Sequence, residues 1–259
     1  MGPISFAPWT AGRAAHAPDT GAPTGPGIRS REDYYRYLEA DRLALEQTRT
    51  RPRLFGDGVW RFQRLLRAVE YHDACRRAWY HRPMRTVLYL CLHLASVRLG
   101  FTIPPHVFGP GLSLAHRGTV VVNSCARVGA NCRLHACTNI GSWPGAAATH
   151  APVVGENVYI GPGAVLYGPI TIADNIAIGA NSVVTTSFTE PDITIAGAPA
   201  RKIHDGGTTR FAQPGQHVLP APLPAPVGEP DAPPAPPASP DAFAEGPAQP
   251  ALADAGALR

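Results

Sequence analysis

The stretch VGENVYIGPGAVLYGPITIADNIAIGANSVV, residues 154–184, repeats an aliphatic residue at every sixth position. The aliphatic positions are Val154, Ile160, Leu166, Ile172, Ile178 and Val184. Glycine or alanine usually follows the aliphatic residue, and the fourth position after it is small or apolar, as at Ala164 and Ser182. Two inward positions in six residues fit neither a helix nor ordinary strand alternation. The repeat predicts short strands, three to a coil, of a left-handed parallel β-helix.

Such a coil is a triangular prism whose interior is filled by the aliphatic residues. The next residue is expected at the corner, where glycine, asparagine or alanine tolerates unusual backbone dihedrals or close approach. Coils then stack through parallel ladders about 4.7–4.9 Å apart. The same repeat runs earlier in the chain, through Val122, Val128, Leu134 and Ile140. Cys132 occupies a small inward position and is expected to be a core filler.

Two interruptions break this period. The first lies just after His116. Phe108, Leu114 and Val120 are six residues apart, but the next series of aliphatic residues starts at Val122, two residues out of phase. The second is the fourteen-residue spacing from Ile140 to Val154, where six or twelve would keep the phase. The segment 142–150 is therefore expected to loop out from a corner. Loops on rigid scaffolds often carry functional residues, so both interruptions are candidate sites.

Composition divides the chain into four expected segments. These are a disordered tail at 1–29, a helical segment at 30–102, the β-helix at 103–207 and a disordered Pro/Ala-rich tail at 208–259. The tails contain too few aliphatic and aromatic residues to offset the entropy of ordering. The C-terminal tail is either dispensable or a docking segment for a partner. The fold class is therefore mainly β with an α-helical N-terminal segment.

Three helices are expected between residues 30 and 102. Ser30 followed by Asp33 resembles a capping box with Asp in place of Glu. The second helix carries one apolar face, formed by Val59, Phe62, Leu66 and Val69. The third, from about Met84 to Leu99, is apolar nearly all round. We expect it to be buried against the rest of the protein or a sister subunit, with contact to a membrane surface as the alternative.

Charge and cysteine content exclude several classes of protein. The net charge of +4 is too small for a nucleic-acid binder that neutralises many phosphates. The five cysteines are odd in number and include no CxxC pair, which favours neither a disulfide framework nor a structural zinc site. The chain contains neither a signal-peptide pattern nor an apolar run of about 20 residues. We expect a cytoplasmic protein with reduced thiols.

Five motifs between Gly100 and Ile203 carry a family resemblance. They are GPGLSLAH at 109–116, NIG at 139–141, YIGPGA at 159–164, IGANSVV at 178–184 and AGAPARKI at 196–203. In these motifs the chain resembles the hexapeptide-repeat acyltransferases, and among them the serine acetyltransferase-like branch. The resemblance implies a homotrimer or dimer of trimers, with acetyl-CoA in the groove between two β-helices. It also implies a histidine that acts as general base on the acceptor hydroxyl.

His116 matches that family histidine. An imidazole suits the task because its pKa lies near neutral pH, so it can take a hydroxyl proton as the oxygen attacks the thioester. His150, in the loop, is a second candidate that would bind the acceptor or the pantetheine arm. The alternative for His116 is a corner histidine without chemistry.

For the cofactor, the candidate residues are Gly141, Gly161, Gly179, Ala180, Arg201 and Lys202. At the first four, a small or absent side chain lets the pantetheine arm approach the backbone, although corner geometry alone would also favour them. Arg201 and Lys202 follow the last coil and either meet the CoA phosphates as charge-assisted donors or form a solvated pair.

The chain departs from serine acetyltransferase at three positions that bear on the acceptor. Ala115 and Phe101 stand where that enzyme has aspartates, and the loop arginine that would hold the serine carboxylate has no match, the nearest residues being Thr149 and His150. A site without those charges suits a zwitterion poorly, because a buried amine and a buried carboxylate each need a partner. The residues Glu32–Tyr35 and Arg51–Gly56 look like those of relatives associated with surface polysaccharide synthesis. A sugar hydroxyl is therefore the favoured acceptor, and L-serine, in cysteine biosynthesis, is the alternative.

Two other classes remain open. One is a non-catalytic trimeric scaffold. The other is a metalloenzyme of the γ-carbonic anhydrase type, which would draw its ligands from His106, His116, His135 and His150. No pair of these histidines has a tight ligand spacing, so no metal site is expected. His106 and His135 are expected to be surface or packing residues.

Overall fold

The computed structural model describes residues 27–143 and 150–208. The expected tails at 1–29 and 208–259 lie almost entirely outside these residues, as does most of the expected loop at 142–150. The helices are α1 (Arg31–Ala44), α2 (Gly58–Cys75) and α3 (Arg82–Leu99), with a short 3₁₀ turn, η1 (Trp79–His81), before α3. The strands follow from residue 101 onward, whereas the sequence placed residues 101–102 in the helical segment.

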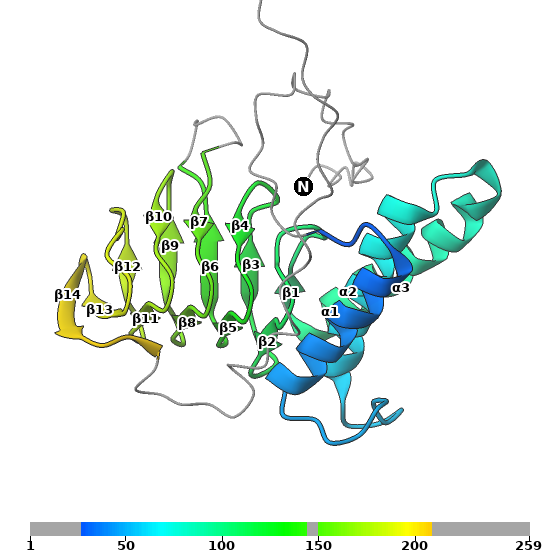
Figure 1. The fold of residues 1–259 in the computed structure, drawn as a ribbon, viewed down its shortest axis with the longest axis horizontal. Helices are drawn as coiled ribbons and strands as arrows, with labels where there is room; N and C mark the ends of the chain where they lie inside the picture. Colours follow the sequence, from blue (N-terminus) through cyan, green and yellow to red (C-terminus); the bar gives the residue numbers. More distant parts are fainter. Residues whose placement is uncertain (1–26, 144–149, 209–259) are drawn as a thin grey trace, which may run out of the picture. The chain divides into compact units, whose positions relative to one another are not determined.

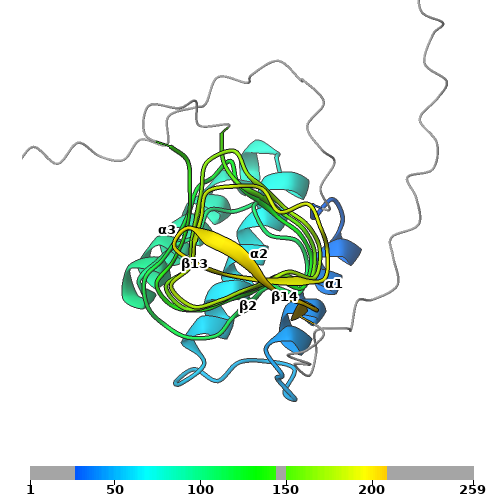
Figure 2. The ribbon, with the colours of Figure 1, turned by 90° about the vertical axis from the view of Figure 1, so that its left-hand side faces the viewer.

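The strands form three sheets, one on each side of a prism (Figures 1 and 2). Sheet A contains β1 (Phe101–Thr102), β3 (Val120–Val122), β6 (Thr138–Gly141), β9 (Val165–Tyr167) and β12 (Val183–Val184). Sheet B contains β4 (Arg127–Val128), β7 (Val153–Val154) and β10 (Thr171–Ile172). Sheet C contains β2 (Ser113–Leu114), β5 (Arg133–Leu134), β8 (Tyr159–Ile160), β11 (Ala177–Ile178), β13 (Ile193–Gly197) and β14 (Ala200–Asp205). The architecture is the predicted left-handed parallel β-helix.

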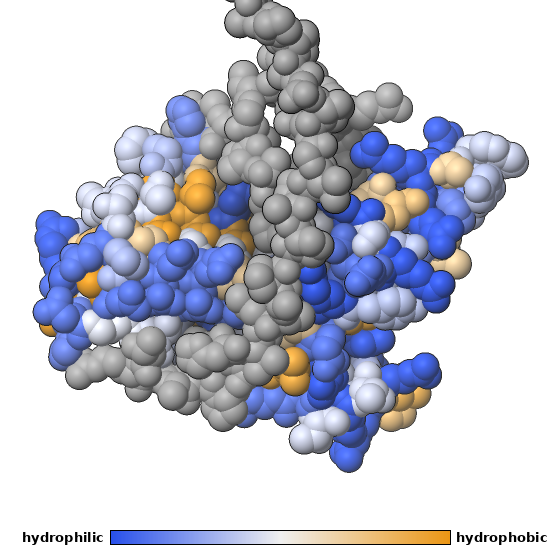
Figure 3. Space-filling model, viewed as in Figure 1, coloured by the Kyte–Doolittle hydropathy of each residue, from blue (hydrophilic) through white to orange (hydrophobic). Residues whose placement is uncertain are grey.

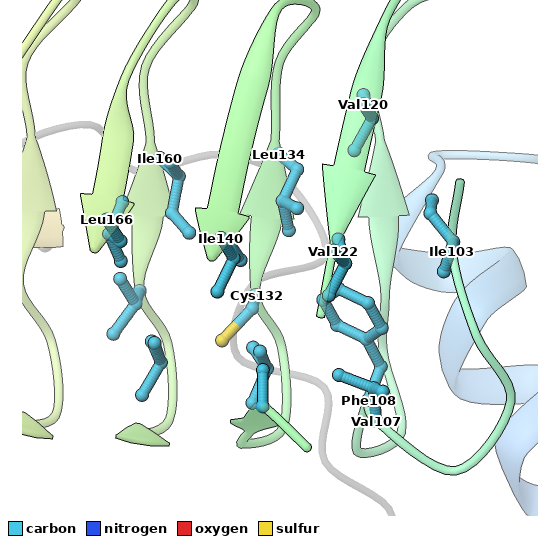
Figure 4. Packing of buried hydrophobic residues seen from close by; sticks show 14 of the residues in the cluster. Ile103, Val107, Phe108, Val120, Val122, Cys132, Leu134, Ile140, Ile160 and Leu166 are labelled. Atoms are coloured by element: carbon cyan, nitrogen blue, oxygen red, sulfur yellow. The ribbon is translucent and has the colours of Figure 1, made fainter. Parts of the chain in front are cut away.

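The aliphatic positions of the repeat fill the interior of the prism (Figure 4). In sheet A, Val122, Ile140 and Leu166 stack in register and are almost wholly buried. The small inward position is also buried, and burial raises the pKa of the Cys132 thiol to about 12. Cys132 therefore stays protonated at neutral pH, as a core filler should.

Both interruptions of the period appear in the strand register. A regular coil is eighteen residues long, as from Ile160 to Ile178, whereas Leu114 pairs with Leu134 twenty residues on. The two extra residues form the bend after β2 that contains His116. The second interruption adds eight residues between β6 and β7, where the chain passes from sheet A to sheet B, and residues 144–149 of it lie outside the described ranges.

The residue after each aliphatic position does not adopt the expected unusual dihedrals. The left-handed conformation falls two residues later, at Asn131, Cys137, Asn157, Gly163, Asn175 and Asn181, with φ between +54° and +73°. Glycine is instead favoured after the aliphatic residue because neighbouring coils approach each other closely there. A Cβ atom at Gly129 would lie 2.6 Å from the carbonyl oxygen of Gly155 in the next coil. The expectation of close approach is thus confirmed, and that of unusual dihedrals at this position is wrong.

The left-handed corners are joined by an asparagine ladder. The Asn131 side chain donates to Asn157 at 3.1 Å, and Asn157 donates to Asn175 at 3.0 Å. Asparagine tolerates the left-handed region better than most residues, and its side-chain amide can donate a hydrogen bond to the next coil. One residue type therefore serves both the backbone conformation and the contact between coils.

Helices α1 and α2 cover the free edge of the first coil, which would otherwise expose unpaired backbone groups. Asp41 of α1 accepts from the backbone N–H groups of Gly111 and Leu112, each at 2.9 Å. Gln63 of α2 donates to the Leu112 carbonyl at 2.5 Å and accepts from the N–H of Leu114 at 3.4 Å. Side chains thus replace the neighbouring strand that β2 lacks on this edge.

Arg67 of α2 lies at the centre of this helical cap and is fully buried. Its guanidinium pairs with Asp41 at 2.9 Å and with Glu70 at 3.0 Å. It also donates to the carbonyl oxygens of Phe108 and Gly109, at 2.9 and 2.6 Å. Burial opposes the charge, but the two carboxylates outweigh burial and raise the pKa of Arg67. The charged group therefore stays ionised inside the cap.

The predicted helices α1 and α2 are confirmed with their expected apolar faces. Ser30 accepts from the backbone N–H of Asp33 at 3.0 Å, as an N-cap residue does. The Asp33 carboxylate accepts from the N–H of Arg29 rather than from Ser30, so the capping box is not closed in its usual form. On α2, Phe62 and Leu66 are buried in the main core.

Helix α3 does not have the expected burial. Of its residues, Leu92 is buried, whereas its large outward-facing side chains, Met84, Val87, Leu90, Leu94 and Val97, are more than half exposed. The helix is an outer element that packs through one face on α2, and its other, apolar face has no partner among the described residues. Burial against the described part of the chain is therefore wrong for this face, and the sister subunit and the membrane surface remain predictions. Within the described ranges, no helix is both long and apolar enough to span a bilayer.

The far end of the prism is closed by a hairpin. Strand β14 pairs antiparallel with β13, in contrast to the parallel ladders of the coils. On the face shown in Figure 3, polar side chains cover α1 and the lower coil faces, and a group of apolar side chains lies over the coils around β7 and β9. Val153 of β7 is one apolar side chain that is exposed.

Replacing Arg67 by Met should lower the free energy of unfolding by about 3–5 kcal/mol, because it leaves Asp41 and Glu70 buried without a counter-charge. Urea denaturation monitored by circular dichroism measures the change. Arg64→Met on the same helix is the control, since Arg64 makes no hydrogen bond or ion pair within the described ranges. Equal losses for both variants would contradict the role of Arg67.

Replacing Gly129 by Ala should also destabilise the fold, by about 1–3 kcal/mol, because the new methyl group meets the backbone of the next coil. Thermal unfolding checks this. Gly27→Ala is a matched control, since no atom lies within 4 Å of a Cβ there. If Gly129→Ala had the same melting temperature as the control variant, the close approach of the coils would not require glycine at this position.

Candidate active site

His116 lies in the bend that follows β2 and is exposed. Its ring centroid is 5.7 Å from that of His135, and the His135 ring is 5.2 Å from the Tyr159 ring. Each of the three rings belongs to a different coil, because β2, β5 and β8 are neighbours in sheet C. The result is a column of rings that starts at His116.

His135 is part of this column rather than an isolated surface residue. Burial lowers the pKa of the imidazole, and the nearby charges of Arg133 and His116 lower it further. Its Nε2 atom is buried and has no hydrogen-bond partner among the residues that the structure describes. A neutral imidazole has one donor and one acceptor nitrogen, so His135 can form a hydrogen bond with His116 or with a ligand. Leu114 and Leu134 are aliphatic positions of the repeat and pair in neighbouring coils. The proximity of His116 and His135, which follow them, could therefore have been inferred from the strand register.

His150 lies on a different corner of the prism. It precedes β7 of sheet B and is exposed, and residues 144–149 before it are outside the described ranges. His116 follows β2 of sheet C, so it belongs to the corner between sheets C and A. The two predicted catalytic histidines are not brought together within one chain.

The four predicted cofactor residues with small side chains divide between the same two corners. Gly161, Gly179 and Ala180 follow strands of sheet C, and a Cβ atom at Gly161 would lie 2.8 Å from the nitrogen of Ala180. These glycines are thus required by coil stacking. Gly141 ends β6 of sheet A, and a Cβ atom there would meet side-chain atoms alone, the nearest being the Asn139 oxygen at 3.0 Å.

The two predicted basic residues on β14 are not equivalent. Lys202 Nζ is paired with Glu190 at 2.6 Å and Asp205 at 2.7 Å. Arg201 makes no ion pair with any residue that the structure describes, and it stands opposite Ala196 in the hairpin register. Arg201 therefore has charge available for an anionic ligand, whereas the charge of Lys202 is already balanced.

A cavity of about 930 Å³ lies between the segment 45–61, helices α2 and α3, and the first coils, and His116 itself is not among the residues that line it. The two sequence neighbours of His116, Ala115 and Arg117, both line it. Further lining residues are Trp60, Ser113 and Arg133. Sequence reasoning missed this cavity because it depends on how the helical segment packs against sheet C. The outward positions of β2 and β5 were nevertheless recognisable as the residues just before Leu114 and Leu134.

Phe101, which stands at one of the two positions where an aspartate is expected, belongs to the core. It is 3% exposed, and its ring lies 5.0 Å from that of Phe62. That position therefore joins the helices to the first coil. It offers no side chain to the bend at His116.

The remaining histidine candidate, His106, lies near Asp73, with Nε2 3.6 Å from the carboxylate. Across residues 27–143 and 150–208, no three His, Cys, Asp or Glu side chains gather closely enough to hold a metal ion. Of the four histidines weighed as metal ligands, His116 and His135 are neighbours, whereas His106 and His150 lie elsewhere.

Comparison with known proteins identifies the repeat. Residues 151–186 match the family model described as Bacterial transferase hexapeptide (six repeats). The serine acetyltransferase of Synechococcus elongatus is 31% identical over 129 residues, which are 49% of this chain and 52% of that protein. The chain thus spans about half the length of this curated relative.

Two solved structures are similar over a longer stretch. The Neisseria gonorrhoeae serine acetyltransferase in complex with serine is 26% identical, with a TM-score of 0.52 over 68% of this chain and 71% of that chain. A serine acetyltransferase in complex with CoA is 21% identical, with a TM-score of 0.53 over 67% and 71%. The second match shows the fold alone. The chain is therefore a left-handed β-helix protein that carries the bacterial transferase hexapeptide repeat and is similar to the serine acetyltransferases.

Proposed function

We propose that the chain is an acetyl-CoA-dependent O-acetyltransferase with His116 as the general base. The observation that carries the proposal is the position of the exposed His116 on the bend after β2, next to the neutral ring of His135 and between two residues that line the 930 Å³ cavity. His116 removes the proton of the acceptor hydroxyl as the oxygen attacks the acetyl carbonyl carbon. The tetrahedral intermediate collapses to the ester, and the CoA sulfur leaves and takes up the proton from His116.

The donor site of this proposal runs along the corner beside sheet C. Gly161 and Gly179 let the coils stack closely at that corner, and the exposed Ala180 beside them has a side chain small enough for a pantetheine arm to approach. Arg201 stands further along the prism with an unpaired charge for a CoA phosphate. The Synechococcus serine acetyltransferase, 31% identical over 129 residues, supports acetyl-CoA as the donor.

The comparisons favour L-serine as the acceptor over the sugar hydroxyl expected from the sequence. The Synechococcus relative is a serine acetyltransferase, and the Neisseria structure contains serine. One observation keeps a sugar hydroxyl as the second candidate. Ala115 and the buried Phe101 leave the site without the two carboxylates that the resemblance leads one to expect for an amino group.

We further propose that the active site is completed between chains of a homotrimer. His116 and Gly141 lie on different corners of one prism, and so do His116 and His150, so a neighbouring prism is needed to bring the corners together. The apolar face of α3, formed by its five exposed large side chains, also lacks a partner among residues 27–143 and 150–208. A trimer of closed symmetry would satisfy both requirements.

His116→Ala should lower kcat by about 10²–10⁴-fold and leave the Kd of acetyl-CoA nearly unchanged, because the imidazole faces the acceptor. Release of free CoA thiol measures turnover, with L-serine and a panel of sugars as acceptors. His93→Ala is the control, since His93 is exposed on α3. Full turnover in His116→Ala would refute the base assignment.

Light scattering should give a mass of three chains or a multiple of three. Co-expression of His116→Ala and His150→Ala chains should yield mixed trimers more active than either variant alone, since one intact site can form from two chains. Each variant co-expressed with itself is the control. A stable monomer, or mixed trimers without regained activity, would contradict the shared site.

A further inference from the structure

The cavity lined by Ala115 and Arg117 has polar walls whose hydrogen-bonding groups are unused. Trp60 Nε1, Ser113 Oγ and Arg133 Nε are all buried and have no hydrogen-bond partner among the described residues. All three residues line the cavity. A buried polar atom without a hydrogen-bond partner destabilises the fold. Three such atoms around one cavity therefore indicate that a bound ligand forms hydrogen bonds with them.

These unused groups are donors. The indole N–H and the guanidinium N–H can donate and cannot accept, and the serine hydroxyl can do either. A ligand that satisfies them must present acceptor oxygens. Carboxylate and phosphate groups do so with two or more oxygens each, and their bonds to Arg are strengthened by charge.

The charges around the cavity point to the same ligand chemistry. Arg98 and Arg117 line it and make no ion pair within the described ranges. Of the acidic lining residues, Asp57 is held by Arg49 at 2.9 Å and by the N–H of Arg53 at 2.7 Å. The cavity therefore has an excess of unpaired positive charge.

Glu46 is the remaining acidic residue in the lining. It lies 3.9 Å from Arg133, a distance that leaves the pairing loose. The Arg133 atom nearest to Glu46 is Nη1, so Nε remains free for a ligand. Glu46 therefore balances part of the arginine's charge without using its Nε donor.

We propose that this cavity binds the anionic group of the acceptor, a carboxylate or a phosphate, through Arg117, Arg133, Ser113 and Trp60. The inference rests on the proposed acetyl transfer and specifies its acceptor: a hydroxyl compound that carries a negative charge. His116 does not line the cavity, but it stands in the chain between Ala115 and Arg117, which do, so an acceptor anchored by Arg117 must extend out of the cavity along the bend to reach the base. The volume lies in the range of small-molecule sites and exceeds what one amino acid fills, so a sugar with an anionic group fits as well as serine.

Binding is tested first without any enzymatic step. Inorganic phosphate, added at constant ionic strength against chloride, should raise the melting temperature of the full chain. The rise should disappear in the double variant Arg117→Gln/Arg133→Gln and persist in Arg127→Gln, whose side chain is on β4 of sheet B, away from the cavity. No rise, or an equal rise in the double variant, would overturn the proposal.

Kinetics with matched acceptors form the second test. D-glucuronate and D-glucose 1-phosphate are compared with neutral D-glucose, and L-serine represents the small carboxylate. For whichever anionic acceptor is acetylated, Arg117→Gln and Arg133→Gln should each raise KM about 10- to 100-fold, with the KM of acetyl-CoA unchanged. Arg117→Gln alone is informative if Arg133→Gln does not fold, since Arg117 is on an exposed bend.

The two arms separate failure of the inference from failure of the proposed function. Efficient transfer to a neutral sugar, with no effect of either arginine variant, would refute the anionic acceptor and leave the acetyltransferase standing. Phosphate binding that depends on both arginines, without transfer to any acceptor, would support the anion site and refute the acetyltransferase. A larger effect on the KM of acetyl-CoA than on that of the acceptor would assign the cavity to CoA and overturn the inference.

Discussion

The buried ion pairs of Arg67 hold the first coil of the prism in place. A β-helix has no neighbouring strand at its first coil, and here the missing partners are supplied by Asp41, Gln63, Arg67 and Glu70 from two helices. Their cost of desolvation is offset because every charge meets a counter-charge or a backbone group. The bend with His116 leaves β2 at this coil, so the cap also sets the position of the proposed base.

Stacking above the cap depends on two constraints of different kinds. Glycine after the aliphatic residue lets neighbouring coils approach, and asparagine two positions later accepts the left-handed corner and bonds to the next coil. Together they fix the spacing of the coils. Fixed spacing aligns the outward residues Ser113, Arg133 and Tyr159 in sheet C. The same regularity that builds the core therefore builds one wall of the cavity.

The sequence was sufficient to predict the prism, its two interruptions and the three helices, because each depends on residues close together in the chain. The corner dihedrals were misplaced by two residues, since periodicity identifies the inward positions and does not say where the backbone turns. The exposure of Leu90 and Leu94 on α3 and the cavity around Arg133 were not predictable in this way. Both depend on how the helical segment packs against the coils, and no repeat encodes that packing.

The closing hairpin has a consequence for growth along the prism axis. A parallel solenoid with open ends can add further copies strand by strand and form fibres. Here the first coil is covered by helices, and the last ladder ends in the antiparallel strand β14, whose outward side chains include the charged Arg201, Lys202 and Asp205. Both ends are therefore blocked to end-to-end polymerisation. Copies of this chain are left to associate sideways, through the flat faces and corners.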